Sequence, residues 1–384
     1  MRLTEGVMST PELRVVVRTD ASLAIGTGHV MRCLTLASTL REQGAAVFFV
    51  CREHDGHLCD LIETRGFSVS RLRSAHLDNQ GEHSSTYVIR SASSWEEDAR
   101  QTQIAIDALA LKPDWLVVDH YDIDEQWEGA LRTSVHSVMV IDDLADRAHD
   151  CDLLLDQNLV GQLSTRYVNK VPPTCAVLLG LKYALLQPIY GELHDHVALR
   201  HGSIRRLLVF MGGADRNNLT GRMLSACLSL DRPDIDVDVV IPLGSNCEKS
   251  IREQASGHAN VHLYRDLPTL APLMAQADLA IGAAGTTSWE RLCLGLPTLV
   301  VTVADHQVPI ADEQHRQGLI RRLGHQDQVT ESAVKQALEE LIQQGLDVEW
   351  SNRCHAVVDG RGVQRVCEAL TKDVDTDVKV RHTR

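Results

Sequence analysis

The sequence predicts an α/β protein built from two Rossmann-like domains that face each other across a central cleft. Three observations support this fold class. The order strand, glycine loop and helix opens the chain at residues 14–40 and recurs from Arg205. Short β-branched and aliphatic runs alternate with segments of helical periodicity, as in parallel α/β sheets. The 384 residues are also enough for two domains of ordinary size.

The predicted domain boundary lies where Pro188, Gly191 and Gly202 interrupt a polar segment. The two glycine-loop units share little sequence identity, so the repeat is one of architecture. Met8 is a candidate alternative start. We therefore predict a flexible arm at 1–12, an N-terminal domain at 13–195, a C-terminal domain at 196–370 and a polar, disordered tail at 371–384.

His29 is the candidate catalytic residue of the opening unit. A strand at 15–17 leads into a loop with Gly26 and Gly28, and His29 stands where the helix begins. Free backbone N–H groups and the positive end of the helix dipole meet there, which suits an anionic or hydroxyl-rich ligand. The dipole also disfavours imidazolium, so a neutral His29 is able to accept a proton. The alternative is that His29 only caps or packs a surface turn.

The first glycine loop is not a dinucleotide fingerprint. Arg32 stands where the third glycine would be, and the second strand, 47–50, leads into Cys51 and Arg52 instead of an acidic residue. Nicotinamide binding is therefore disfavoured.

Polar residues end several later strands of the N-terminal half. After helical patterns near 54–67 and 95–111, short buried runs at 116–118 and 138–141 are each followed by acidic residues, and CDLLLDQN predicts a further strand. This is the edge at which open parallel sheets bind ligands. The polar residues are Asp119, His120, Tyr121, Asp142, Asp143 and Asn158. A metal site at the three aspartates is the less favoured interpretation, because carboxylates often cap strand ends.

The second half contains two glycine loops after predicted strands. MGGAD follows a strand that begins near Arg205, and GAAGTTSWE follows a strand at 277–281. On neighbouring strands these loops direct two helix N-termini toward one point, which suits a diphosphate. Thr287 or Ser288 is predicted to cap the second helix, and Glu290 in its first turn is placed to bind the two hydroxyls of a ribose. The alternatives are a plain tight turn and a favourable charge near a helix start.

The composition excludes several classes of protein. A net charge of −14 and a pI near 5.7 disfavour a general nucleic-acid or membrane-surface role. No apolar run approaches the roughly 20 residues of a membrane span, and MRLTEGVMST lacks the apolar core of a signal peptide. Ten cysteines without a C-x-x-C pair are expected to be reduced thiols. We expect a cytoplasmic protein.

Together these motifs resemble one known family over nearly the whole chain. The matching segments are GTGHVMR at 26–32, DHYD at 119–122, IDDLADR at 141–147, CDLLLDQN, LLGLKYALL at 178–186, FMGGADRNNLT at 210–220, GTTSWERLCLGLP at 285–297 and DGRG at 359–362. They resemble the UDP-2,4-diacetamido-2,4,6-trideoxy-β-L-altropyranose hydrolases of pseudaminic acid synthesis. That family is related in fold to the two-domain B-type glycosyltransferases of peptidoglycan synthesis.

The resemblance implies that water displaces UDP from the anomeric carbon with inversion, without a metal or cofactor. His29 then activates the water, and the C-terminal half holds UDP with Glu290 on the ribose. The implied substrate contacts are Gly28, Arg32, Tyr121, Gly212, Gly213, Asn218, Ser288, Glu290, His306 and Gln307. The chain departs from the family in having Asp122 after DHY and His306 where the family has asparagine. A related UDP-sugar is therefore an open alternative substrate.

Two other functions fit the same motifs. A glycosyltransferase of this fold would pass the sugar from UDP to an acceptor hydroxyl, and we expect an apolar or basic docking patch on its N-terminal half. No such patch is evident between residues 53 and 110. A non-catalytic UDP-sugar-binding module would bind without turnover.

Overall fold

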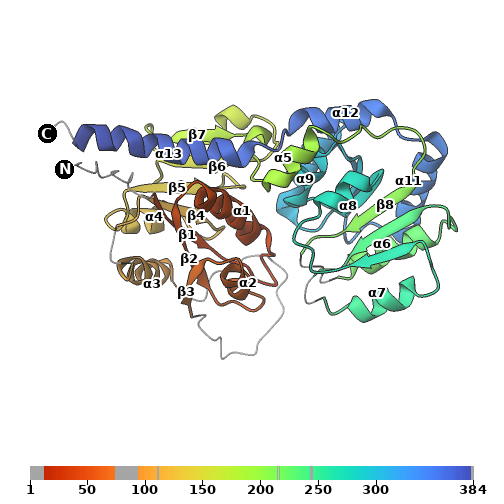
Figure 1. The fold of residues 1–384 in the computed structure, drawn as a ribbon, viewed down its shortest axis with the longest axis horizontal. Helices are drawn as coiled ribbons and strands as arrows, with labels where there is room; N and C mark the ends of the chain where they lie inside the picture. The colour runs from red at the N-terminus through yellow and green to blue at the C-terminus, as the bar shows by residue number, and fades with distance from the viewer. Residues whose placement is uncertain are drawn as a thin grey trace, which may run out of the picture.

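The predicted fold class is confirmed by a computed structural model with two lobes, each built on a parallel sheet with helices on both faces (Figure 1). The structure describes residues 13–73, 94–109, 112–213, 215, 217–242 and 245–381. The expected arm at 1–12 lies outside these residues. No helix in the described ranges has the length and apolar character needed to cross a membrane.

The N-terminal sheet has seven parallel strands, with the first glycine loop leaving its centre. Val15, Val16 and Val17 in β1 are almost fully buried, as a strand covered on both faces requires. In spatial order the strands are β3 (Ser68–Leu72), β2 (Ala46–Arg52), β1 (Arg14–Thr19), β4 (Trp115–Asp119), β5 (Ser137–Ile141), β6 (Leu153–Asp156) and β7 (Ala176–Leu179).

Helices cover both faces of this sheet and begin at recognisable caps. Ser94 accepts a hydrogen bond from the Glu97 N–H at the start of α3, and Asp124 caps α4 in the same way. The helical elements are α1 (Gly28–Glu42), α2 (Cys59–Thr64), α3 (Trp95–Asp107), α4 (Glu125–Leu131) and the short 3₁₀ helix η1 (Leu163–Thr165).

The C-terminal sheet has six parallel strands and repeats the same winding order. Its strands in spatial order are β10 (Val261–Tyr264), β9 (Asp236–Val240), β8 (Arg206–Phe210), β11 (Leu279–Ala283), β12 (Thr298–Thr302) and β13 (Arg321–His325). The helical elements of this half are η2 (Leu181–Tyr183), α5 (Pro188–His194), α6 (Leu219–Leu228), α7 (Glu248–Ala255), α8 (Ala271–Gln276), α9 (Thr287–Cys293), η3 (Asp305–Gln307), α10 (Val308–Arg316), α11 (Glu331–Gln344) and α12 (Val348–Val357). Because β8 and β11 are neighbours, the two glycine loops that follow them leave adjacent strands, as predicted.

The last helix returns to the N-terminal lobe, which differs from the predicted domain limits. Helix α13 (Gly362–Arg381) lies along the N-terminal lobe in Figure 1. Val366 and Leu370 are fully buried in the N-terminal core, and Trp115 Nε1 donates to the Leu370 carbonyl at 2.9 Å. The segment expected to be a tail is helical as far as Arg381. The sequence analysis predicted neither this helix nor the core that it joins, and the expected disorder of residues 371–381 is wrong.

The first crossing between the lobes also comes earlier than predicted. Leu181, Leu186 and Tyr190 are buried in the core of the C-terminal lobe, although the predicted boundary follows residue 195. Leu185 is still buried in the N-terminal core, so the chain crosses between the lobes over residues 181–186 and crosses again near residue 361.

The two crossing segments are in backbone contact at glycines. A Cβ added to Gly360 would lie 2.5 Å from the Gly191 Cα, and one added to Gly362 would lie 2.3 Å from the Ala184 carbonyl oxygen. Asp359 holds this turn by accepting hydrogen bonds from the Arg361 N–H and the Arg365 guanidinium. The DGRG motif is therefore explained by a close approach of two chain segments.

We expect Gly362→Ala to destabilise the fold by about 1–3 kcal/mol or more, because its methyl group would overlap backbone atoms that have no rotamer freedom. The free energy of unfolding in urea measures this effect. Gly161→Ala is the matched control, since a Cβ there meets nothing within 4 Å and the expected change is below roughly 0.5 kcal/mol. Equal stability of the two variants would contradict the close approach.

Candidate functional site

The loops at the carboxyl ends of the two sheets meet between the lobes. A Cβ added to Gly213, after β8, would lie 2.3 Å from Thr27 Oγ1, and one added to Gly28 would lie 3.5 Å from the side chain of Thr286, after β11. Gly212 has a φ of +97°, which only glycine adopts readily, and opens this turn. The three predicted glycine loops therefore converge on one place.

His29 is held by a buried carboxylate at this meeting point. It is the second residue of α1 and 6% exposed, and its Nδ1 lies 2.7 Å from Asp119 Oδ1. The ring of Tyr121 packs edge-on against the imidazole, with centroids 4.4 Å apart. A neutral His29 that donates from Nδ1 to the carboxylate keeps Nε2 as a proton acceptor. The pair has the geometry of a general base and its orienting acid.

Asp119 is a candidate functional residue whose contact with His29 the sequence did not reveal. It ends β4 and is fully buried. Burial opposes its ionisation, but the Arg32 guanidinium and the His29 imidazole together outweigh that cost and hold the pKa of Asp119 well below its usual range. The DHY motif at a strand end was a signal for a site, but nothing local showed that the carboxylate faces His29.

Arg32 was an expected substrate contact, but its guanidinium group forms ion pairs with two carboxylates of the protein. It binds both oxygens of Asp119 at 2.6 Å and reaches Asp143 Oδ2 at 2.8 Å. Two of the three aspartates weighed as metal ligands, Asp119 and Asp143, are thus paired with a buried cation, and Asp142 pairs with Arg147. Within the ranges that the structure describes, no group of three or more His, Cys, Asp or Glu side chains is arranged to hold a metal ion.

His306 faces the N-terminal lobe from the opposite side. It lies in η3, and its ring centroid is 5.6 Å from that of Tyr121. Burial lowers the pKa of His306, which favours the neutral imidazole. Its neighbour Gln307 turns back on its own loop, where Oε1 accepts from the Val303 N–H at 2.9 Å. The structure therefore brings His29, Tyr121 and His306 together, while the Gln307 oxygen has an internal partner.

Side chains already occupy the N-terminus of α6, one of the two expected diphosphate sites. Asp215 accepts from the N–H groups of Leu219 and Thr220 at 2.7 and 2.8 Å. Asn218, an expected substrate contact, accepts from the Gly221 N–H at 3.2 Å and so caps the helix. These N–H groups have partners within the protein, so this helix is less available to an anion than the glycine loop indicated.

Helix α9 begins differently from the prediction. Its N-cap is Thr286, and no side chain caps it, so the expected cap at Thr287 or Ser288 is wrong. Ser288 instead accepts from the Arg291 guanidinium at 3.1 Å, and Arg291 also donates to the Ala283 carbonyl. Burial lowers the pKa of Arg291 to about 10. The uncapped end of α9 lies beside Gly28, because Thr286 is the residue that contacts it.

Glu290 carries an unsatisfied acceptor in the C-terminal lobe. Its buried Oε2 has no hydrogen-bond partner among the residues that the structure describes, and the nearby Tyr190 hydroxyl has none either. Burial raises the pKa of Glu290 to about 7, against the smaller opposing effects of the nearby Tyr190 hydroxyl and Arg291 guanidinium. A buried acceptor without a donor is costly, so a ligand hydroxyl that donates to Glu290 would relieve that cost.

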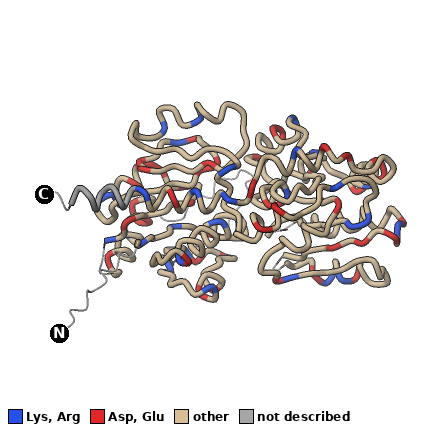
Figure 2. Tube along the Cα trace, turned by 45° about the horizontal axis from the view of Figure 1, so that its top comes forward, with Lys and Arg blue, Asp and Glu red and all other residues tan. Residues whose placement is uncertain are grey.

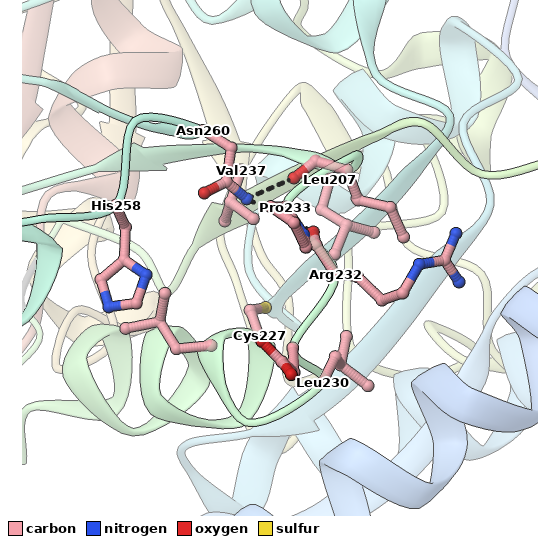
Figure 3. Close-up of a pocket in the computed structure, with 11 residues that line it drawn as sticks. Leu207, Cys227, Leu230, Arg232, Pro233, Val237, His258 and Asn260 are labelled. Carbon is pink, nitrogen blue, oxygen red and sulfur yellow. Dashed lines mark hydrogen bonds between the residues drawn. The ribbon is translucent and has the colours of Figure 1, made fainter.

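The charge distribution and the cavities add little to this site. Positive and negative residues are interspersed along the chain in both lobes (Figure 2). A cavity of about 60 Å³ is lined by residues including Leu207, Cys227, Val237 and His258 (Figure 3). Leu207 and Val237 lie near the starts of β8 and β9, at the edge of the sheet opposite the glycine loops. This cavity is separate from the candidate site and too small for a nucleotide.

Comparisons with known proteins agree with this two-lobed arrangement. Residues 207–359 match the glycosyltransferase family 28 C-terminal domain. The chain is 28% identical to the UDP-2,4-diacetamido-2,4,6-trideoxy-beta-L-altropyranose hydrolase of Campylobacter jejuni, over 73% of this chain and 89% of that protein. It is 24% identical to the protein MJ1062 of Methanocaldococcus jannaschii, over 75% of this chain but only 55% of that protein.

Among solved structures, MurG of Acinetobacter baumannii superimposes with a TM-score of 0.62 at 16% identity, covering 94% of this chain and 99% of that one. A likeness at this identity is evidence for the fold alone. The chain therefore has the two-domain glycosyltransferase-B fold, and residues 207–359 of its C-terminal half are similar to the family 28 glycosyltransferase C-terminal domain.

Proposed function

We propose that this protein is an inverting, metal-independent hydrolase that removes UDP from UDP-2,4-diacetamido-2,4,6-trideoxy-β-L-altropyranose, or from a close UDP-sugar, and releases the free sugar. The observation that carries the proposal is the His29–Asp119 pair, with Nδ1 and Oδ1 2.7 Å apart, beside the glycine loops of the other lobe. The 28% identity to the Campylobacter hydrolase, over 89% of its length, supports the substrate class.

In the proposed reaction His29 Nε2 takes a proton from a water molecule as the water attacks the anomeric carbon. The attack comes from the face opposite UDP, so the configuration inverts. The electrons of the breaking carbon–oxygen bond pass to the diphosphate, which is a good leaving group and needs no proton. Asp119 stays ionised because Arg32 lowers its pKa, and it stabilises the imidazolium that forms.

The C-terminal lobe is proposed to hold the nucleotide. The unpartnered Oε2 of Glu290 would accept a hydrogen bond from the ribose, and the uncapped start of α9 would face the diphosphate. The N-terminus of α6 is expected to contribute less to diphosphate binding, because Asp215 already accepts hydrogen bonds from its N–H groups.

We expect Glu290→Ala to weaken UDP binding roughly 10- to 100-fold, as for loss of a hydrogen bond to a charged group. Because the pKa of Glu290 is raised to about 7, its carboxylate is mostly protonated at pH 6 and mostly ionised at pH 8. The affinity advantage of wild type over Glu290→Gln should therefore grow from pH 6 to pH 8. Calorimetric titration with UDP at both pH values measures this difference, and the comparison cancels the ionisation of UDP itself.

Glu339→Gln is the control for this titration, since Glu339 is an exposed residue of α11 paired with Lys335. Its UDP affinity should match wild type at both pH values. An unchanged affinity in Glu290→Ala would remove Glu290 from the ribose site.

A glycosyltransferase is the second candidate, favoured by the match of residues 207–359 to the family 28 domain. Incubation of the protein with the UDP-sugar in buffer without an acceptor separates the two activities. Release of free sugar and UDP supports the hydrolase. Turnover only after an acceptor is added supports the transferase, and UDP binding without any turnover would overturn both.

A further inference from the structure

Asp143 is a second carboxylate near the meeting point of the glycine loops, and the proposed reaction assigns it no role. It follows β5 by two residues, at the same sheet edge as His29 and Tyr121. Asn158 Nδ2 donates to its Oδ1 at 2.8 Å, and Arg32 Nη1 contacts both of its oxygens, at 3.0 and 2.8 Å. The carboxylate is therefore held in one orientation from two sides. Its side chain remains 13% exposed, unlike the fully buried Asp119.

Asp143 also acts electrostatically on the rings that line the cleft. Burial raises the pKa of Tyr121, and Asp143 is the largest charged contributor in the same direction. Burial lowers the pKa of His306, and Asp143 is the largest contributor that opposes this. The geometry agrees with this: Asp143 and Asp119 share the Arg32 guanidinium, and Asp119 holds His29, which packs against Tyr121. Asp143 therefore belongs to the group of side chains against which the proposed sugar would lie.

The ionised side chains of the N-terminal lobe at this site do not cancel one another's charge. Arg32 contributes one positive charge, and Asp119 and Asp143 contribute two negative charges. Arg166, which donates to the Asp143 backbone carbonyl, is paired with the carboxylate of Asp156. With neutral imidazoles, the N-terminal wall of the cleft carries a net negative charge. A carboxylate accepts about four hydrogen bonds, and the Arg32 and Asn158 contacts leave acceptor capacity on Oδ2. Such a wall favours sugars that donate hydrogen bonds and disfavours sugars that carry a carboxylate.

We propose that Asp143 is a specificity-determining residue that selects UDP-sugars with neutral, hydrogen-bond-donating substituents, such as hydroxyl or acylamino groups, and excludes UDP-uronates. This inference rests on the proposed function, because it assumes that the sugar of a UDP-sugar lies against the N-terminal lobe. It adds the exclusion of charged sugars and the side chain that is responsible for it.

The test compares UDP, UDP-glucose and UDP-glucuronate by calorimetric titration with wild type and Asp143→Asn. Wild type should bind UDP-glucuronate roughly tenfold or more weakly than UDP-glucose, as expected for two like charges brought together. In Asp143→Asn this ratio should fall to about threefold or less, with UDP affinity changed by less than about threefold. A gain in relative affinity for the uronate cannot arise from general damage to the site.

Asp146→Asn is the matched control, because it makes the same change in the same motif at a side chain that is 60% exposed and paired with Arg147. It should keep the wild-type ratio. Asp143→Ser is a second variant should the asparagine variant fail to fold.

UDP binding with an unchanged ratio in both Asp143 variants would overturn this inference and leave the proposed function intact. Equal affinity of wild type for UDP-glucose and UDP-glucuronate would also overturn this inference and leave the proposed function intact. Failure of wild type to bind UDP would overturn the proposed function and this inference with it.

Discussion

His29→Ala is expected to lower turnover of the UDP-sugar by about 10²- to 10⁴-fold, the range for loss of a general base. UDP affinity should stay within about threefold of wild type, because the proposed nucleotide site lies in the other lobe, around Glu290. The imidazole acts only when water attacks, so its loss changes the rate of the chemical step and not the binding of the leaving group. Single-turnover release of free sugar and calorimetric titration with UDP measure the two effects.

A matched control for this experiment is His262→Ala. His262 lies on β10, its side chain is 39% exposed, and it pairs with Asp236 away from the lobe interface. It should turn over and bind UDP as wild type does. Activity retained in His29→Ala would exclude His29 as the base, and a large loss of UDP affinity would show that the nucleotide depends on the N-terminal lobe.

Asp119→Asn is expected to lower turnover by about 10²-fold or more. The amide keeps the shape of the carboxylate but no longer enforces a donating Nδ1 on His29 or stabilises the imidazolium that forms. Because Asp119 acts through His29, the double variant with His29→Ala should turn over no more slowly than His29→Ala alone, within about threefold. Turnover of the four proteins in this cycle at saturating substrate measures the coupling.

The loss of the Asp119 charge also leaves Arg32 with Asp143 as its remaining carboxylate partner, so stability must be measured beside turnover. Thermal unfolding separates the two effects, since a merely destabilised variant recovers its turnover at lower temperature. Independent, multiplicative losses in the double variant would show that Asp119 does not act through His29.

Several parts of the site were predictable because they are local. The β-branched run before Gly26 and Gly28, followed by helical spacing, predicts the loop that places His29 at the start of α1. The same logic located the loops after β8 and β11. Each depends on residues a few positions apart, where backbone geometry and hydrophobic periodicity are decisive.

Other parts were not predictable because they depend on distant residues. Asp119 and Arg32 are separated by 87 positions, and only the pairing of β1 with β4 brings them together. Asp215 was taken as part of a glycine loop, but its side chain caps α6. The predicted substrate roles of Gly28, Gly212 and Gly213 and the other motif residues stay predictions, although the structure places several of them at one point.

The amino-acid order alone specified the α/β class, the two glycine-loop units and the candidate base, since these follow from short-range periodicity and turn chemistry. Folding in three dimensions decided which lobe receives α13, which carboxylate orients His29, and which helix start remains uncapped. The physical reason is that burial and ion pairing are properties of an environment assembled from many segments. A buried carboxylate such as Asp119 is stable only beside a cation, and that cation comes from another part of the chain.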